Sequence, residues 1–257
     1  MNKFIKGELH ILKKISRGKK IALISVLSAF VLIVGACAIY LGDYYRADEG
    51  AISAFAPMAG VTTYETEDGY TVFSAEGATA GVIFYPGGKV DSRAYAPLMA
   101  ALAERGITSV LVDMPFNLAV FDINAADGVR EEIAGVSDWY MAGHSLGGSM
   151  AASYLEKHVG EFSGLILLGS YSTADLSDSP LRALCIHGTE DGVMNREKHD
   201  SYFGNLPVGT PDIEIEGGCH AYFGMYGEQE GDGEPTLTAS EQILITADYI
   251  SDFVFGR

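Results

Sequence analysis

A serine between two spaced glycines is the first candidate for chemistry in this chain. The pattern is Gly143-His144-Ser145-Leu146-Gly147. The apolar run Asp138–Gly143, which favours a strand, precedes the serine, and the small-residue run Leu146–His158, which favours a helix, follows it. On such a turn a serine hydroxyl projects above the sheet, and glycines two residues away remove side chains that would collide with the chain. We therefore predict that Ser145 is a nucleophile; the alternative is a turn serine that caps the helix.

A serine nucleophile needs a base, and the base needs a carboxylate to orient it. The histidines after Ser145 are His158, His187, His199 and His220. His220 follows Gly217-Gly218-Cys219, just past the last predicted strand. Sites in open α/β sheets form there, at the carboxyl ends of the strands. We predict that His220 is the base.

The carboxylate is predicted in the segment 186–191, which runs from a strand into a turn. Both Glu190 and Asp191 stand there, between the serine and the histidine in chain order. That order is the one such triads follow on an α/β sheet. We predict Asp191, which Gly192 follows, as the acid, and we expect Glu190 to be a solvated loop charge.

Two backbone N–H groups are needed to hold the negative charge that develops on a substrate oxygen. The N–H of Leu146, directly after the serine, is the first candidate. The loop Pro86-Gly87-Gly88-Lys89 supplies the second, because its glycines let the backbone approach a substrate closely. We predict Gly88 as this donor, with Lys89 as the alternative.

These residues require a framework that brings distant loops together. Short apolar runs typical of buried strands alternate with segments of helical spacing. The predicted strands are Val61–Glu65, Tyr70–Ala75, Gly81–Tyr85, Ile107–Asp113, Asp138–Gly143, Phe162–Gly169, Arg182–His187 and Pro211–Glu216. The predicted helices are Ser92–Arg105, Ile123–Ala134, Leu146–His158, Arg196–Phe203 and Ser240–Phe255. The pattern predicts an α/β fold whose sheet is mostly parallel and doubly wound, with an antiparallel hairpin at one edge. We expect the acidic segment Gly227–Pro235 to be a solvated surface loop.

The motifs at 85–88, 143–148, 187–191 and 217–224 resemble the α/β-hydrolase superfamily, and most of all its compact dienelactone-hydrolase-like branch. The resemblance covers roughly residues 60–255. It implies an α/β-hydrolase fold with Ser145, Asp191 and His220 as the catalytic residues. This chain departs from the pattern in two places: most relatives begin the oxyanion loop with His-Gly, and dienelactone hydrolase uses a cysteine nucleophile. The serine points to general esterase chemistry.

The resemblance implies an acyl-enzyme on Ser145. We expect a carboxylesterase acting on small or polymer-borne acyl esters, because only about twelve residues separate strands Phe162–Gly169 and Arg182–His187, too few for a sizeable cap domain. An envelope-associated acyltransferase or peptidase is the alternative, and a non-catalytic binding module is the alternative from another class. We expect no cofactor and no metal site, because Cys37, Cys185 and Cys219 lack metal-ligand spacing.

The N-terminal segment differs from the rest in charge and hydropathy. Residues 1–20 carry seven Lys or Arg and one acid, so +6 lies there and −23 in the remainder of a net −17. The 21 residues from Ile21 to Leu41 are uncharged, enough for a helix to cross about 30 Å of hydrocarbon. The positive-inside rule predicts a basic cytoplasmic terminus at 1–20, a transmembrane signal anchor at 21–41, a linker at 42–59 and a hydrolase domain at 60–257 outside the cytoplasm.

Two other interpretations of this segment stay open: a cleaved signal peptide, and a lipidated Cys37 in Val34-Gly35-Ala36-Cys37. The expected partners are the cell membrane, through the N-terminal helix, and a small-molecule or acylated envelope substrate. A domain this acidic is not expected to bind nucleic acid. The sequence leaves the oligomeric state open.

Overall fold

The computed structural model describes residues 16–67 and 69–257, and the compact unit within it is Tyr44–Arg257. Residues 1–15 of the predicted basic terminus lie outside the described residues. Helix α2, Arg17–Gly42, contains the uncharged segment, and Ser16 caps its N-terminus. By length and composition α2 could cross a membrane, although signal sequences share these properties.

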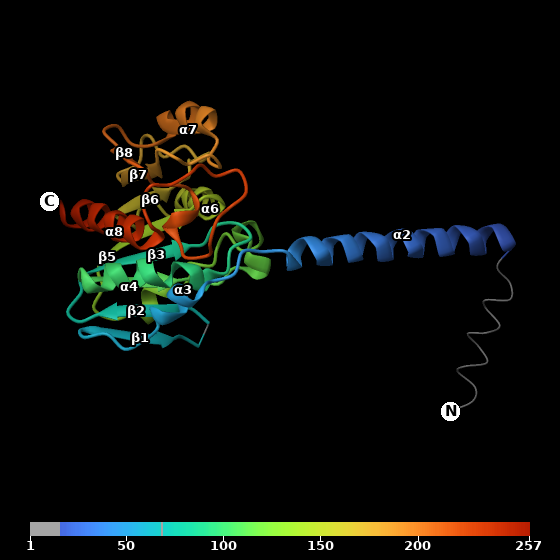
Figure 1. Ribbon diagram of the computed structural model, residues 1–257, viewed down its shortest axis with the longest axis horizontal. Helices are drawn as coiled ribbons and strands as arrows, with labels where there is room; N and C mark the ends of the chain where they lie inside the picture. Colours follow the sequence, from blue (N-terminus) through green and yellow to red (C-terminus); the bar gives the residue numbers. More distant parts are fainter. Residues whose placement is uncertain (1–15, 68) are drawn as a thin grey trace. The chain divides into compact units, whose positions relative to one another are not determined.

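Eight strands of the described chain form one sheet at the centre of the compact unit (Figure 1). They are β1 Val61–Glu65, β2 Thr71–Ala75, β3 Ala80–Tyr85, β4 Ile107–Leu111, β5 Asp138–His144, β6 Gly164–Leu168, β7 Arg182–Gly188 and β8 Asp212–Ile215. Their order is β1-β2-β4-β3-β5-β6-β7-β8. The pairs β1–β2 and β2–β4 are antiparallel, and every pair from β4 onward is parallel. The predicted hairpin and mostly parallel sheet are confirmed.

Both faces of the sheet are covered, which explains why its inner strands are apolar at every position. In β3, Val82 and Phe84 belong to one core cluster, whereas Ile83 and Tyr85 belong to the cluster on the opposite face. Helices α4 (Ala96–Glu104) and α8 (Ala239–Phe255) contribute to the first cluster, and α6 (Leu146–Leu155) contributes to the second. Figure 1 shows α4 and α8 together on the near side of the sheet. The doubly wound arrangement follows from these two layers.

The remaining helices are short: α3 Glu49–Ser53, α5 Val129–Glu132 and α7 Arg196–Tyr202. Single 3₁₀ turns occur at Ser92–Tyr95, Pro115–Asn117, Ala119–Phe121, Phe203–Asn205 and Ala221–Phe223. The predicted helix Ile123–Ala134 is wrong except for α5. Gly128 has a φ of 80°, a left-handed conformation that no α-helix continues through. Residues 169–181, between β6 and β7, contain no helix, so nothing there forms a cap.

The segment predicted as a linker, 42–59, mostly belongs to the compact unit. The Tyr45 N–H donates to the Lys89 carbonyl at 2.8 Å, and the Asp91 N–H donates to the Tyr45 carbonyl at 2.9 Å. Ala51, in α3, is completely buried. The chain therefore joins the folded unit at Tyr44, well before the predicted boundary at residue 60.

Candidate active site

Ser145 lies on a sharp turn between β5 and α6. Its φ of 52° and ψ of −122° are strained for a residue with a side chain. Close packing on both sides requires glycine: a Cβ on Gly147 would lie 2.2 Å from the Tyr85 carbonyl oxygen, and one on Gly143 would lie 2.6 Å from the backbone of Gly147. The Ser145 N–H donates to the Leu168 carbonyl at 2.9 Å, which ties the turn to β6. The predicted strand–turn–helix arrangement is present.

Asp191 and His220 form a buried pair. His220, which is 1% exposed, donates its Nδ1–H to Oδ2 of Asp191 at 2.8 Å. Oδ1 of Asp191 accepts the N–H groups of Val193 and Met194 at 3.0 and 2.8 Å. Burial raises the pKa of the Asp191 carboxyl, but the hydrogen bonds from His220 and the two backbone groups outweigh it and hold the pKa below 3.8. Glu190, the alternative acid, accepts instead from the hydroxyl of the preceding residue.

The end of β6 connects this pair to the serine turn. A Cβ on Gly169 would lie 2.9 Å from Nδ1 of His220 and 3.0 Å from Oδ2 of Asp191. The next residue, Ser170, donates its hydroxyl to the Ser145 carbonyl at 2.6 Å. Nε2 of His220 is buried and has no hydrogen-bond partner among the described residues. The structure thus places the three predicted residues at the same end of the strands, with Ser170 and Gly169 between the serine turn and the buried pair.

The two predicted oxyanion donors are neighbours. A Cβ on Gly88 would lie 2.9 Å from Cδ2 of Leu146. Leu146 is the first residue of α6, so its N–H has no acceptor within the helix. The N–H of Lys89, the alternative donor, is already used, because it donates to the Asn117 carbonyl at 2.7 Å. The geometry therefore favours Gly88 over Lys89.

A second buried histidine supports the oxyanion loop. The Tyr95 hydroxyl accepts the Gly87 N–H at 3.1 Å and lies 2.7 Å from Nδ1 of His144. The rings of His144 and His220 are 4.4 Å apart between centroids. Burial, with the nearby His220, holds the pKa of His144 well below 6.5, so its ring is neutral. Sequence reasoning assigned His144 no role. Its hydrogen-bond partner Tyr95 stands 49 residues earlier in the chain, so the contact is not visible in the sequence.

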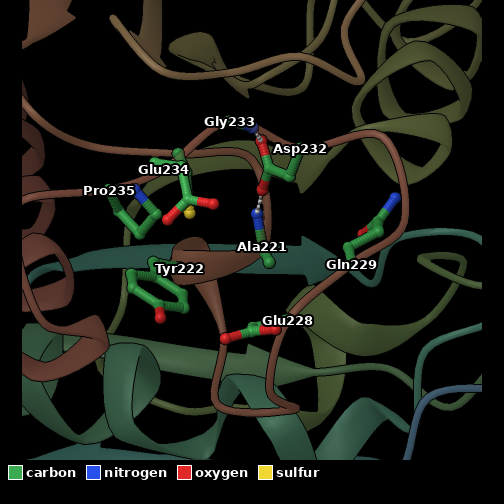
Figure 2. Close-up of a pocket in the computed structure, with 9 residues that line it drawn as sticks. Ala221, Tyr222, Glu228, Gln229, Asp232, Gly233, Glu234 and Pro235 are labelled. Carbon is green, nitrogen blue, oxygen red and sulfur yellow. Dashed lines mark hydrogen bonds between the residues drawn. The ribbon is translucent and has the colours of Figure 1, made fainter.

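Asp232 is a further residue that sequence reasoning missed. Its carboxylate accepts the N–H groups of His220, Ala221 and Gly192 at 3.0, 2.8 and 3.2 Å. Figure 2 shows Asp232 joined to Ala221 beside a cavity of about 120 Å³. Asp232 therefore links the loop that carries His220 to the loop that carries the acid. The expectation that Gly227–Pro235 is a surface loop is confirmed, since none of its residues is buried, but the acidic composition of the loop did not single out Asp232.

A cavity of about 250 Å³ opens beside Ser145. Its walls combine polar and apolar groups: Leu146, Ser149, Gly169, Ser170, Tyr171, Val193, Met194 and Asn195. This volume is below the range of about 300–1,000 Å³ that encloses drug-sized ligands. The cavity therefore suits a small group attached to a larger molecule, or a small molecule.

Residues that could hold a metal ion lie outside this site. Within the described part of the chain, Cys185, His199 and Asp212 place one ligand atom each within 4.8 Å of one another. Sequence spacing did not indicate them, because they come from β7, α7 and β8.

Comparison with known proteins gives a family match and a partial relative. The family model described as "Alpha/beta hydrolase family" matches residues 81–244. A proline iminopeptidase from Thermoplasma volcanium is 28% identical over 127 residues. That alignment covers 45% of this chain and 43% of the iminopeptidase, so the chain spans less than half the length of this relative.

Several solved structures share the fold at low sequence identity. Dienelactone hydrolase from Anabaena variabilis has a TM-score of 0.55 at 14% identity, with 77% of this chain and 98% of that chain covered. Est1E from Butyrivibrio proteoclasticus has a TM-score of 0.55 at 15% identity, with coverages of 77% and 100%. Carboxyl esterase 2 from Tuber melanosporum has a TM-score of 0.56 at 14% identity, with coverages of 82% and 91%. At these low sequence identities, the similarity shows that the fold is shared and carries no information about substrate.

Proposed function

Because this chain belongs to the alpha/beta hydrolase family, we propose that it is a serine hydrolase, specifically a carboxylesterase that forms an acyl-enzyme on Ser145. The observation that carries the proposal is the buried pair of Asp191 and His220 beside the strained serine turn. Such a pair is what an alcohol nucleophile requires, and a capping serine would not need it.

In the proposed mechanism, His220 acts first as base and then as acid. Nε2 takes the proton from Ser145 Oγ as that oxygen attacks the ester carbonyl, while Asp191 holds Nδ1–H and so fixes the tautomer. The N–H groups of Leu146 and Gly88 bind the oxyanion. The tetrahedral intermediate collapses, and the alcohol leaves with the proton from His220. Water then attacks the acyl-enzyme with His220 again as base, which releases the acid and restores Ser145.

The small cavity and the absence of a cap between β6 and β7 support small acyl esters or acyl groups carried on a polymer as substrates. A bulky polymer can approach a site that no cap covers, and only the acyl group then needs to enter the cavity. Two proteins of similar fold are named as esterases or carboxyl esterases, which also favours ester cleavage.

A peptidase is the second candidate, because the partial relative is a proline iminopeptidase. An acyltransferase on envelope material would use the same acyl-enzyme with another acceptor than water. A panel of p-nitrophenyl esters of increasing chain length, run beside prolyl and alanyl anilides and an acyl-acceptor assay, separates the three activities. A non-catalytic binding module would act on none of them.

For location, we propose that residues 21–41 anchor the protein in the cell membrane, with residues 1–20 in the cytoplasm and the hydrolase unit outside it. The uncharged span and the basic residues before it support this topology. Protease added to intact cells should then remove the hydrolase unit. Release into the medium with a new N-terminus near Ala38 would instead indicate a cleaved signal, and a lipid on Cys37 would indicate a lipoprotein.

A fluorophosphonate probe tests the serine hydrolase directly. The wild type should be labelled covalently and Ser145→Ala should not be. Ser153→Ala is the matched control, since this serine lies on the same helix and its hydroxyl donates to the Ser149 carbonyl at 3.0 Å. An unlabelled wild type, or equal labelling of Ser145→Ala, would contradict the proposal.

A further inference from the structure

Four side chains with metal-binding chemistry meet where β7, α7 and β8 come together. Cys185 and His187 lie on β7, His199 lies on α7, and Asp212 is the first residue of β8. Cys185, His187 and His199 are all buried, with exposed fractions of 1%, 4% and 3%. A buried thiol, two imidazoles and a carboxylate form a set of donors that Zn²⁺ and similar ions prefer.

The donor atoms lie close enough for small side-chain movements to bring them around one ion. Nε2 of His187 lies 3.2 Å from Oδ1 of Asp212, and Nε2 of His199 lies 3.5 Å from the same oxygen. Cys185, His199 and Asp212 each place a ligand atom within 4.8 Å of the others. Ligands at about 2.0–2.3 Å from a tetrahedral zinc ion lie about 3.3–3.8 Å from one another.

The hydrogen bonding of this cluster is incomplete. Among the described residues, neither Nδ1 of His187 nor Nε2 of His199 has a hydrogen-bond partner, although both are buried. A buried nitrogen without a partner costs free energy. Nε2 of His199 lies 3.5 Å from Oδ1 of Asp212, within ion-pair distance but without hydrogen-bond geometry, so a metal ion between the two atoms would replace only this ion pair.

We propose that Cys185, His199 and Asp212 form a structural site for a divalent transition metal ion, with Zn²⁺ the best match, and that a shift of the neighbouring His187 side chain supplies the fourth ligand. Binding would release the Cys185 thiol proton to solvent and leave the thiolate on the metal. Four protein ligands leave no open position, so the ion would have a structural role.

The guanidinium group of Arg196 competes with a metal ion for the His187 imidazole. Nη1 of Arg196 lies 3.3 Å from Nε2 of His187, and Arg196 also binds the Glu214 carboxylate and the Gly188 carbonyl. Binding of the ion would need Arg196 to give up only the contact with His187, while its other two partners retain it.

The position of the site gives the ion a mechanical role. β8 is the edge strand of the sheet and has only four residues, of which Ile215 is the one that is buried. An ion would fasten β8 and α7 to β7 just before Asp191, which follows the end of β7. This role does not depend on the proposed esterase activity.

Metal content and spectroscopy test the site on the full-length protein in detergent. After chelation and reloading, the wild type should hold one Zn²⁺ per chain by elemental analysis. Loaded with Co²⁺ instead, it should show the d–d bands of tetrahedral cobalt together with a thiolate-to-cobalt charge-transfer band. Zn²⁺ should also raise the melting temperature of the chelated protein.

Matched variants identify the ligands. Cys185→Ser should lose the charge-transfer band, whereas Cys219→Ser, at the other buried cysteine, should keep it. His199→Gln should weaken zinc binding tenfold or more, whereas His158→Gln should not. If Cys185→Ser fails to fold, the cobalt spectrum of the wild type and the His199→Gln titration still decide. A wild type that holds no Zn²⁺ after loading, or a charge-transfer band unchanged in Cys185→Ser, would overturn the proposal.

Discussion

At the scale of single residues, the adjacent carboxylates Glu190 and Asp191 differ in what they contact. Asp191 accepts three hydrogen bonds, including the one from His220, whereas the Glu190 side chain is half-buried and paired with a hydroxyl. Asp191→Asn should therefore lower kcat by about 10³–10⁴-fold with little change in KM, because an amide no longer stabilises the correct tautomer and charge of His220. Steady-state kinetics on a soluble ester measures this.

Glu190→Gln is the control for this prediction and should keep kcat within about twofold, since surface charges removed from the reacting atoms contribute little. Comparable losses in both variants would show that the loop, and not the Asp191 carboxylate, governs activity.

The neutral His144 predicts a pH dependence of stability. Its pKa in the folded protein lies well below 6.5, so the unfolded chain binds a proton in a pH range where the folded protein does not. The contribution of the neutral His144 ring to the free energy of unfolding is therefore fully present above about pH 6.5. It is lost as the pH falls toward the pKa of His144 in the folded protein. The free energy of unfolding of the wild type, relative to His144→Gln, should fall by about 1.4 kcal/mol per pH unit below about pH 6.5.

Urea unfolding at several pH values between about 7.5 and 5 measures the difference, where the ordinary histidine pKa is about 6.5. His158→Gln, at a partly exposed histidine, serves as the control for general charge effects. A difference that is independent of pH would mean that the pKa of His144 is the same in the folded and the unfolded chain, which would contradict the prediction.

At the scale of elements, the serine turn depends on contact between two loops. A Cβ on Gly147 would overlap the backbone carbonyls of Tyr85 and Pro86, at 2.2 and 2.3 Å. Backbone atoms cannot move aside as side chains can, so Gly147→Ala should destabilise the fold by about 1–3 kcal/mol or more and displace Leu146 from the oxyanion loop. Thermal unfolding and fluorophosphonate labelling both detect this.

Gly160→Ala is the matched control, because a Cβ at this exposed glycine meets nothing within 4 Å. If Gly147→Ala were as stable and reactive as Gly160→Ala, the close approach of the two loops would be contradicted.

Elements whose signal is local could be predicted from the sequence, and those that depend on distant partners could not. Gly81–Tyr85 is apolar at every position because both faces of β3 are covered, and that pattern is visible in the chain itself. The helix expected at 123–134 failed at Gly128, whose left-handed conformation overrides the apolar spacing. Asp232 could not be found, because three of its four N–H partners come from two other loops.

The same distinction applies to the candidate site. Ser145, Asp191 and His220 each stand directly after a strand or its turn, so parallel strands bring them to one edge. The sequence predicts Gly88 ahead of Lys89, and the structure adds a reason, because the Asn117 carbonyl accepts the Lys89 N–H. A residue pattern does not contain that contact.

At the scale of the whole molecule, the chain divides at Asp43 rather than at residue 60. Tyr45 pairs with the backbone of Lys89 and Asp91, directly after Gly88, and Phe55 packs on Phe73 with ring centroids 5.6 Å apart. These contacts hold the oxyanion loop and one edge of the core. A chain that starts at Tyr44 should therefore fold and keep its kcat/KM on soluble esters.

A chain that starts at Gly60 should be less stable and less active than one that starts at Tyr44. Loss of two backbone hydrogen bonds and the packing of α3 should cost about 2 kcal/mol, a fall in Tm of about 4–8 °C for a unit of this size. Its kcat/KM should fall about tenfold or more, because complete loss of an oxyanion donor costs about 10²–10³ and Gly88 would lose its support. Equal Tm and kcat/KM for the two chains would show instead that residues 44–59 act as the linker predicted from the sequence, and that the oxyanion loop holds its shape without them.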